Sequence, residues 1–461
     1  MIDKKKIRLM SRTEILKDIV DQIENDYAGQ DALPAEAHGI GIKYLQAMGT
    51  LESLHAMEDR FLNDMVQLYL ASLKVPGVRF AVSDSRDFKN YWRGFSAETR
   101  GQVLFVTEAI PESGLVAGDR IVKLNQMEPR LFFNQNGMRD KDEPLSGDEK
   151  WDAFFNHTGF VYVERQKEAA EPETLRILLK EFPLPKAAEK ESVRMCETED
   201  GNLLLRLPDF EEEEPVREAA AWLEEKLAGR QEFAAKEAGQ QEQTEKVAGQ
   251  PELVEGRLAG ITLTLDLTGC PGGAPENLVP LLQFLVKEPQ SLGDFWGQAV
   301  EKTHYTERVC DLLRLQMEPY VNAPEEEIRA FAAERLKEID AMQEKAAGHG
   351  AMQEKAAGHG AMKEPEGQPE SPLSEDLEPV QVLDEPELMI QPKPGIGQVV
   401  LKVDGETGGE AEWLVTRLAA LPHVRVSGGK MSGTGFFGNY VTMDYTGGVT
   451  FTYPATKWEI I

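Results

Sequence analysis

One short apolar segment followed by a glycine-rich turn constrains the fold of this chain more than any other feature. Residues 261–267, reading ITLTLDL, have the length and composition of a buried β-strand. The turn Thr268-Gly-Cys-Pro-Gly-Gly273 follows directly, and a helical pattern then covers residues 276–286. Strand, turn and helix in this order are typical of an α/β layer, so we predict an α/β core.

The end of the chain repeats this pattern of strand and helix. Residues 398–403 are predicted to form a strand, and residues 410–421 a helix with Leu414 and Leu418 on its apolar face. The other elements expected in this core are strands at 202–210 and 424–426, a helix at 214–227, and a hairpin of residues 440–445 and 449–453 around Gly447 and Gly448.

The first part of the chain changes from helical to β-rich character. Apolar residues recur at helical spacing over residues 11–75, in two runs, the second of which covers 51–73. From about residue 78 the pattern becomes one of short strands and turns. The strands are expected at residues 103–106, 120–125, 159–164 and 175–179, the last two as a pair.

Two segments are too poor in large apolar groups to bury much surface. Residues 229–256 are rich in Gln, Glu, Ala and Gly, and we predict an exposed, partly helical insertion. Helical sequence over 295–342 runs into a repeat, AMQEKAAGHG, at 341–350 and again at 351–360. We interpret 341–394 as a linker. The spacing of His349 and His359 suggests a metal site, but duplication within a linker explains these residues better. We therefore expect no metal and no cofactor.

Charge and cysteine content narrow the classes of partner. The 461 residues include 80 acidic and 50 basic side chains, for a formal net charge of −30. This charge repels nucleic acid and anionic membranes, whereas a basic partner is compatible with it. No stretch approaches the about 20 apolar residues of a membrane span. Three cysteines without paired spacing and a start without a signal-peptide pattern predict a cytoplasmic protein.

Four segments, in this order, resemble the tail-specific (C-terminal processing) serine peptidases. They are EAIPESGLVAGDRIVKLN at 108–125, DLTGCPGG at 266–273, QVVLKVDGETGGEAEW at 398–413 and GTGFFGNYVTMDYTGGVTFTY at 433–453. The resemblance implies an α/β fold, α+β overall, with a crotonase/ClpP-like core. It further implies an N-terminal helical domain (1–75), a PDZ-like β module (76–185), and a peptidase-like core in two parts (190–340 and 395–461).

The resemblance also implies where catalytic side chains should lie, and here the sequence departs from the family. The family motif T-A-S-A-x-E matches Thr407 to Glu412, which puts Gly409 at the position of the nucleophilic serine. A lysine base twenty-five residues later corresponds to Thr434, and a histidine base used in another branch corresponds to Gly77. Glycine offers no nucleophile, and threonine is no base near neutral pH.

The scaffold for an oxyanion hole is better preserved than the catalytic side chains. By resemblance the backbone N–H groups come from Gly272 or Gly273 and from Glu410, although the turn needs these glycines in any case. The Glu410 carboxylate would repel a developing oxyanion. Candidate substitutes for the nucleophile or base in these segments are Thr407, Ser432 and Lys430, with His304 and His423 as further candidate bases.

The family's PDZ-like module holds an extended peptide, and its carboxylate-binding loop corresponds to Tyr91-Trp92-Arg93-Gly94-Phe95. The same five residues read equally well as an ordinary hydrophobic turn. The leading hypothesis is a pseudopeptidase that binds a peptide or protein partner. The alternatives are an active serine-type endopeptidase with a displaced nucleophile and base, and a structural subunit whose linker makes the interactions.

Overall fold

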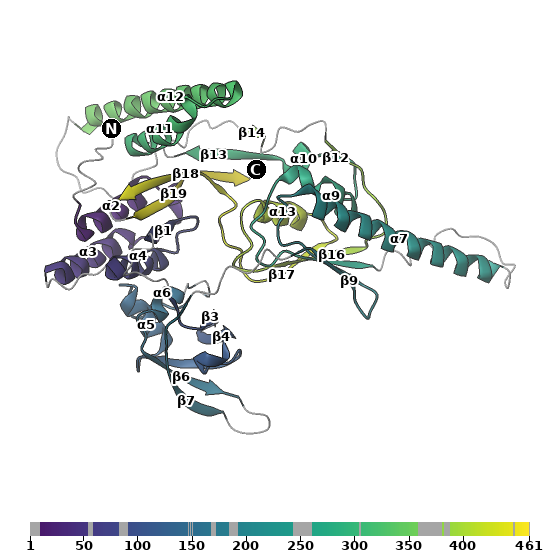
Figure 1. The fold of residues 1–461 in the computed structure, drawn as a ribbon, viewed down its shortest axis with the longest axis horizontal. Helices are drawn as coiled ribbons and strands as arrows, with labels where there is room; N and C mark the ends of the chain where they lie inside the picture. Colours follow the sequence, from purple (N-terminus) through teal and green to yellow (C-terminus); the bar gives the residue numbers. More distant parts are fainter. Residues whose placement is uncertain are drawn as a thin grey trace. The chain divides into compact units, whose positions relative to one another are not determined.

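The computed structural model describes residues 10–53, 59–82, 91–145, 147, 149, 151–166, 172–183, 192–242, 261–303, 306–357, 380–381, 388–445 and 448–460. The chain divides into two units, each assembled from separate segments (Figure 1). The first contains residues 1–187, 302–375 and 438–457, and the second contains 188–301, 376–437 and 458–461. Helices and sheets occur in both units, which confirms the mixed α/β class.

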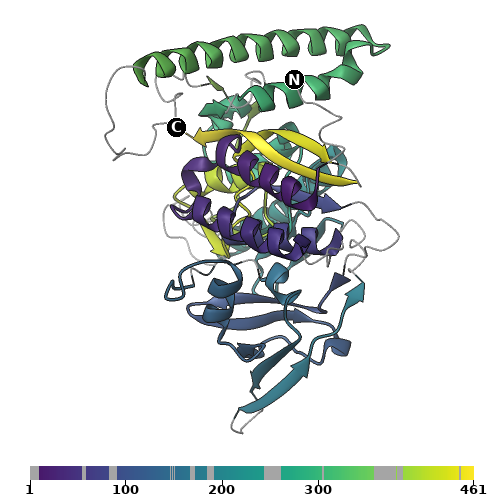
Figure 2. The same cartoon turned by 90° about the vertical axis from the view of Figure 1, so that its left-hand side faces the viewer.

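The first unit begins with three helices, α2 (Arg12–Asn25), α3 (Ala37–Ser53) and α4 (Asp59–Leu73), which lie side by side in Figure 2. Ser11 starts α2 with a capping box, since its hydroxyl accepts from Glu14 N and its own N–H donates to the Glu14 carboxylate. The prediction of helices over 11–75 is confirmed. Of the helical run expected at 51–73, the described residues are helical, in α3 up to Ser53 and in α4 from Asp59.

An antiparallel sheet follows, which we call the β3–β7 module. Its strands are β3 (Phe95–Arg100), β4 (Val103–Ala109), β5 (Arg120–Leu124), β6 (Phe160–Arg165) and β7 (Glu173–Leu178), in that order. Helices α5 (Pro129–Asn136) and α6 (Asp152–Phe155) accompany it, and a short pair joins β2 (Tyr91–Trp92) to β8 (Phe182–Pro183). The predicted pairing of the last two strands is confirmed.

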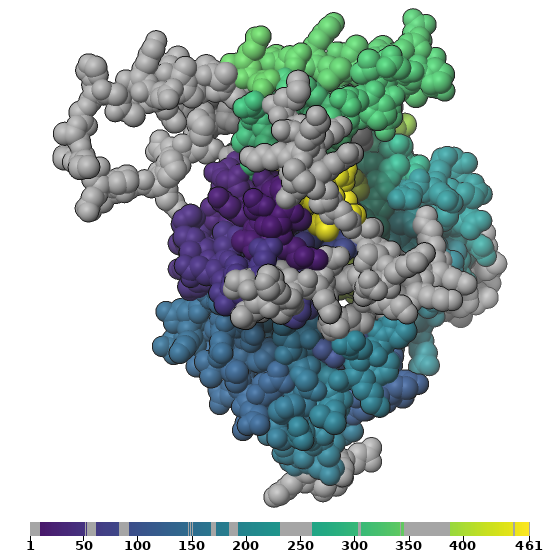
Figure 3. Space-filling model, turned by 60° about the vertical axis from the view of Figure 1, so that its left-hand side comes forward, coloured from purple at the N-terminus to yellow at the C-terminus, as the bar shows by residue number. Residues whose placement is uncertain are grey.

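Buried aromatic rings and one ion pair hold this module together. Trp151, Phe154 and Phe133 are buried and pack on one another beneath the sheet. The turn before β5 is fixed by the buried carboxylate of Asp119, which accepts two hydrogen bonds from Arg165, at 2.8 and 2.6 Å. In Figure 3 the module forms the blue surface next to the purple N-terminal helices.

The hairpin of β18 (Phe437–Tyr445) and β19 (Val449–Ile460) completes the first unit. Strand β1 (Arg79–Val82) pairs antiparallel with β19. On its other side the hairpin meets α11 (Glu307–Val321), where Gln316 Nε2 donates to the Tyr440 carbonyl at 2.8 Å. It also meets α12 (Glu326–Ala357), whose Arg335 donates to Asn439 at 2.9 Å (Figure 2).

One prediction for this region is wrong and another stays untested. Residues 341–357 of the predicted linker continue helix α12, because the repeat is rich in Ala, Gln, Glu and Lys, which favour helices, and their role as a linker stays a prediction. The rest of the predicted linker to 379, and 382–387, lies outside the described residues. Residues 298–303 form strand β13 where a helix was expected, because Gly297 at φ 68° ends α10 (Leu292–Trp296).

The second unit is built on a sheet in the order β17-β16-β11-β10-β9. Strands β10 (Leu203–Arg206), β11 (Thr262–Asp266), β16 (Gln398–Val403) and β17 (Val424–Gly428) run parallel, and β9 (Arg194–Glu197) is antiparallel at the edge. The inward residues of β10, β11 and β16 are buried with side chains from α7 (Glu213–Glu242), η3 (Pro275–Leu278), α9 (Val279–Leu285) and α13 (Glu410–Ala419), whereas Val424 of β17 and Met195 of β9 are partly buried. The α/β core and its principal strands are as predicted.

Smaller elements complete this unit. Strand β12 (Gln290–Ser291) pairs with β15 (Met389–Ile390), and β13 pairs with β14 (Val380–Gln381). Helix α7 extends to Glu242, so the helical part of the predicted insertion is confirmed, and residues 243–256 lie outside the described chain.

A buried polar cluster joins α2 to α11 and to the hairpin within the first unit. Asp26 accepts from Thr306 Oγ1 at 2.6 Å and pairs with Arg308 at 2.9 Å. Burial raises the pKa of Asp26 above its ordinary value, although Thr306 and Arg308 act in the opposite direction. Tyr445 donates to Asp18 at 2.8 Å and accepts from Gln22 at 2.7 Å in the same cluster.

Replacing Arg308 with Met should lower the free energy of unfolding by about 2–4 kcal/mol, because it leaves the Asp26 carboxylate buried without its cation. Urea denaturation measures the loss. The matched control is Arg314→Met, which breaks a pair with Asp340 at 65% side-chain exposure and should cost less than about 1 kcal/mol. Equal losses in the two variants would contradict the assigned role of Asp26.

Candidate functional site

Three loops of the second unit converge at one end of its sheet. Strands β11, β16 and β17 are neighbours and parallel, so the loops that follow them emerge at the same edge, where α/β proteins commonly bind ligands. Hydrogen bonds join the loops: Gly408 N–H donates to the Cys270 carbonyl at 2.9 Å, and Ser432 N–H to the Thr407 carbonyl at 2.9 Å. We call residues 267–273, 404–410 and 429–436 the loop site.

Thr407 fastens the first two loops. Its side chain is fully buried, and its hydroxyl donates to the Leu267 carbonyl at 2.9 Å while accepting from Asp404 N–H at 3.0 Å. The Asp404 carboxylate in turn accepts from Gly269 N–H at 3.0 Å. The Thr407 hydroxyl is buried and already donates its proton to a carbonyl oxygen, which makes it a poor substitute nucleophile.

Gly409, at the position matching the family's serine, is the N-cap of α13 with φ 53° and ψ −138°. This backbone conformation is strained for any residue with a side chain. A Cβ on Gly409 would overlap the carbonyl oxygen of Pro271. The neighbouring Gly408 is also confined, since a Cβ there would lie 2.7 Å from both Ser432 Oγ and Thr434 Oγ1. Position 409 carries no side chain, and the surrounding backbone leaves no room for one.

The structure brings Thr434 next to Gly409, as the spacing of twenty-five residues implied. Gly409 N–H donates to Thr434 Oγ1 at 3.3 Å, and that oxygen lies 2.6 Å from Ser432 Oγ. Both hydroxyls are half-buried. Thr434 thus occupies the place next to the nucleophile position with a neutral hydroxyl and no basic group.

Glu412 holds the third loop, and the sequence analysis did not single it out. Its side chain is buried and accepts from Gly433 N–H at 2.6 Å, from Gly435 N–H, and from Ser432 and Thr434. Burial nevertheless raises the pKa of Glu412 above its ordinary value. The sequence feature that marks Glu412 is its place as the last residue of the segment that matches T-A-S-A-x-E. That match is used above only to align the segment.

The glycine turn after β11 is shaped by its neighbours. Gly272 and Gly273 have φ values of 112° and 152°, which favour glycine, and Gly272 O accepts from Phe210 N–H at 3.1 Å. A Cβ on Gly272 would lie 2.6 Å from Glu410 N and would overlap the Glu410 carboxylate. The Glu410 carboxylate therefore lies against the glycine turn, where a developing oxyanion would meet repulsion.

Cys270 in this turn is not an alternative nucleophile. Burial raises its pKa to about 12, with Asp209, Glu410 and Asp404 acting in the same direction. The group is therefore a neutral thiol at physiological pH. Cys196, Cys270 and Cys310 are free thiols.

The other candidates for the catalytic base are Lys430, His423 and His304, and the position matching the family's histidine is Gly77. Lys430 is exposed on the loop before Ser432. His423 is engaged elsewhere, with Nε2 2.8 Å from the Leu285 carbonyl oxygen, and His304 lies outside the described residues. Gly77 belongs to the first unit, where a Cβ would be 3.0 Å from the Tyr440 hydroxyl and 3.3 Å from Pro454.

The predicted carboxylate-binding loop forms internal contacts. Arg93 donates to the carbonyl oxygens of Phe155 at 3.2 Å and Asn156 at 2.7 Å, and Ile110 N–H donates to Gly94 O. Trp92 Nε1 donates to Phe95 O, and Phe95 is fully buried. The side chain of Tyr91 lies outside the described residues. These contacts favour the hydrophobic-turn reading over carboxylate binding.

Among the residues that the structure describes, no three His, Cys, Asp or Glu side chains are grouped to hold a metal ion. The side chain of His349 and the whole of His359 fall outside that set. Within the same described residues, no helix has the length and apolar character to cross a bilayer.

No protein-family model matches the sequence, and no curated protein matches it either. Solved structures do. Mature CPAF complexed with lactacystin has a TM-score of 0.47 at 12% identity, over 97% of this chain and 90% of that one. The photosystem II D1 C-terminal processing protease has 0.34 at 12%, over 98% and 89%. A putative S41 protease from Bacteroides fragilis has 0.30 at 11%, over 96% and 85%.

The structural neighbours of this chain are thus CPAF and S41 C-terminal processing proteases. At these identities and TM-scores, function has to be inferred from the geometry of the loop site itself.

Introducing a serine at position 409 should damage the fold without creating an enzyme. Gly409→Ser should lower the free energy of unfolding by at least about 2 kcal/mol, since it adds a strained conformation and a clash with Pro271. Gly405→Ser is the control, because a Cβ at Gly405 has only the Lys430 carbonyl in contact range, at 3.8 Å. That control should change stability by no more than about 0.5 kcal/mol. A stable Gly409→Ser variant that reacts with a fluorophosphonate would refute the steric argument.

Glu412→Gln should destabilise the protein by about 1–3 kcal/mol, because an amide replaces one of two oxygens that accept backbone N–H groups. Thermal and urea unfolding report the change. Glu406→Gln makes the same substitution on an exposed side chain of the loop site and should stay within about 0.5 kcal/mol of the parent. If both variants unfold like the parent, Glu412 does not hold the third loop.

Proposed function

We propose that this protein is a non-catalytic, tail-specific-peptidase-like protein that binds a peptide or protein segment. The observation that carries the proposal is the contact of Gly409 with Pro271, which leaves no room for a nucleophilic side chain at the head of α13. Acyl transfer requires a nucleophile, a base and donors for the oxyanion. The backbone disfavours the first of these at position 409.

The other two requirements are also poorly met. Thr434, which contacts Gly409 N–H, has no basic group to accept a proton near neutral pH. The Glu410 carboxylate against Gly272 opposes the negative charge that an oxyanion hole must stabilise. Three separate features of one loop cluster therefore disfavour hydrolysis, and each has a different physical cause.

Binding is supported by what the loop site retains. Its loops are held in place by Thr407 and Glu412, so a recognition surface would need little ordering when a ligand arrives. The adjacent strand β17 lies at the end of its sheet in the described strand order, and an extended peptide can add to such an edge. Asp209, Asp404 and Glu410 surround Cys270 with negative charge, which favours a neutral or basic segment.

The second candidate is an active serine-type endopeptidase with Ser432 as displaced nucleophile. One observation favours it: the Ser432 hydroxyl forms a hydrogen bond with the Glu412 carboxylate, and burial raises the pKa of that carboxylate. Against it, the same carboxylate accepts several backbone N–H groups and serves as a structural anchor. A base so fully hydrogen-bonded is a weak proton acceptor.

A fluorophosphonate should not label the purified protein, and unfolded casein should remain intact, because no hydroxyl of the loop site is both accessible and activated. Labelling that disappears in Ser432→Ala or Thr434→Ala would instead establish the endopeptidase. Lys430→Ala is the control for a change at an exposed position of the same loop.

Peptide binding tests the proposal directly. Immobilised protein should retain Lys- and Arg-bearing unfolded peptides more strongly than acidic ones, and Glu410→Lys should weaken that retention. Deletion of residues 358–379 separates this function from a linker-based one: retention that survives the deletion does not come from the linker. Retention abolished by the deletion and unaffected by Glu410→Lys would favour the structural-subunit hypothesis.

A further inference from the structure

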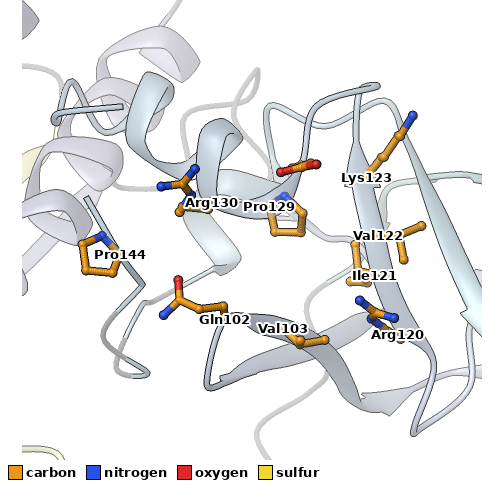
Figure 4. Close-up of a pocket in the computed structure, with 10 residues that line it drawn as sticks. Gln102, Val103, Arg120, Ile121, Val122, Lys123, Pro129, Arg130 and Pro144 are labelled. Atoms are coloured by element: carbon orange, nitrogen blue, oxygen red, sulfur yellow. The ribbon is translucent and has the colours of Figure 1, made fainter. Parts of the chain in front are cut away.

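The β3–β7 module has a pocket of about 780 Å³, bordered by the β3–β4 turn, strand β5 and the start of α5 (Figure 4). Lys123 and Arg130 extend from opposite sides of this pocket in Figure 4, and Arg120 is paired with Glu164 at 2.9 Å. The charged groups of the lining therefore do not converge on one ligand group. A helical surface of the same unit supports a more specific inference.

An apolar patch is exposed where helices α11 and α12 join. Tyr320 and Val321, at the end of α11, are 48% and 41% exposed. Ile328 and Phe331, at the start of α12, are 38% and 61% exposed. Single exposed apolar residues are ordinary, whereas large apolar side chains gathered on one surface mark an interaction site. We call these four residues the α11–α12 patch.

One side of the α11–α12 pair packs on strand β18. Gln316 of α11 donates to the Tyr440 carbonyl at 2.8 Å, and Arg335 of α12 donates to Asn439 at 2.9 Å. Tyr440 and Asn439 are neighbours on β18, so Gln316 and Arg335 lie at the same level of the helix pair. Figure 2 shows α11 and α12 side by side above the β18–β19 hairpin.

The aromatic residues of the patch continue this β18-facing side. Residues four apart on a helix share a face, so Tyr320 lies one turn after Gln316, and Phe331 lies one turn before Arg335. The two helices run in opposite directions, and both steps therefore lead toward the turn that joins them. Tyr320 and Phe331 thus lie next to each other, on a face that is covered at one level and exposed at the next.

Contacts within the chain hold the helix pair in place. Arg314 of α11 donates to Asp340 of α12 at 2.8 Å, and Arg329 donates to two carbonyl oxygens of the turn at 2.7 Å each. The apolar residues that α12 buries are different ones, Ala332 and Ile339. The patch is therefore preformed and exposed, so a partner would bind it at little cost in ordering.

Acidic side chains accompany the patch. Residues 318–334 contain five glutamates and one arginine, a net charge of −4. The arginine, Arg329, is turned to the carbonyl oxygens of the turn. The glutamates, all of them exposed, are Glu318, Glu325, Glu326, Glu327 and Glu334. An apolar surface among exposed carboxylates is complementary to a basic segment that carries large apolar side chains.

The same charge argues against two other occupants. A second copy of this chain would bring another −4 to the shared interface, and like charges placed opposite each other oppose association. An anionic membrane surface would be repelled in the same way.

We propose that the α11–α12 patch docks a basic, amphipathic segment of another protein. Tyr320 and Phe331 are the aromatic anchors, and the glutamates around them face the Lys and Arg side chains of the segment. The patch belongs to the first unit and the loop site to the second, so this docking does not depend on the proposed pseudopeptidase function.

Fluorescence anisotropy on the full chain tests the proposal, with a labelled synthetic helix of Leu and Lys whose Leu residues lie on one face. Tyr320→Ser/Phe331→Ser should weaken binding of this peptide at least about tenfold, because it removes both anchors. Replacing every Lys of the peptide with Glu, or every Leu with Ser, should abolish binding to the parent protein.

A second variant examines the charge of the surface. Glu318→Gln/Glu334→Gln keeps helix-forming side chains but removes two carboxylates, so it should weaken binding about threefold and reduce its dependence on salt. Phe61→Ser is the matched control, since Phe61 is a 37% exposed ring of α4 in the same unit, and it should leave binding unchanged. The replaced patch residues are exposed, so the double variants should unfold in urea at the midpoint of the parent.

Three outcomes would overturn the proposal. The first is unchanged binding in Tyr320→Ser/Phe331→Ser, or equal binding of the Glu peptide. The second is binding that Glu410→Lys abolishes and Tyr320→Ser/Phe331→Ser does not affect, which would place the peptide at the loop site. The third is a dimer in sedimentation that Tyr320→Ser/Phe331→Ser dissociates, which would assign the patch to a second copy of the chain.

Discussion

The close approach of the Pro271 carbonyl oxygen to the α-carbon of Gly409 determines the form of the loop site. This contact joins the turn after β11 to the start of α13, and it requires glycine at position 409. Once these two backbones are in contact, Glu410 is brought against Gly272, and Gly409 N–H reaches Thr434. The backbone arrangement leaves no room for a side chain at position 409, and Ser432 and Thr434 of the third loop pack against the adjacent Gly408. The site is thus a packed and hydrogen-bonded structure in its own right.

Much of this could be predicted from local sequence, for identifiable reasons. The strand at 261–267 and the turn to Gly273 could be predicted because a buried parallel strand is almost continuously apolar and the turn needs glycine. The register from Gly409 to Thr434 also held, since both lie in loops after adjacent parallel strands. Other features depend on burial, which sequence does not report. The sequence gives no sign that Glu412 accepts hydrogen bonds from the third loop, or that Arg93 donates to carbonyl oxygens of its own module.

Composition was a poor guide to secondary structure. The ten-residue repeat is of low complexity, yet its first copy is entirely helical in α12, as its content of Ala, Gln, Glu and Lys favours, and its role as a linker stays a prediction. The strand at 298–303 was not predicted because the turn at Gly297 interrupts a helical pattern with a single residue.

Strand β1 pairs with β19, so Arg79 lies opposite Thr452, a residue far away in the sequence. During synthesis the edge of β1 is exposed long before its partner strand has been made. Contacts between residues so far apart in sequence are slow to form, because closing the intervening loop costs entropy before any contact repays it. Strand β1 therefore lacks this partner until β19 has left the ribosome. An unpaired strand edge can pair with other chains during that interval.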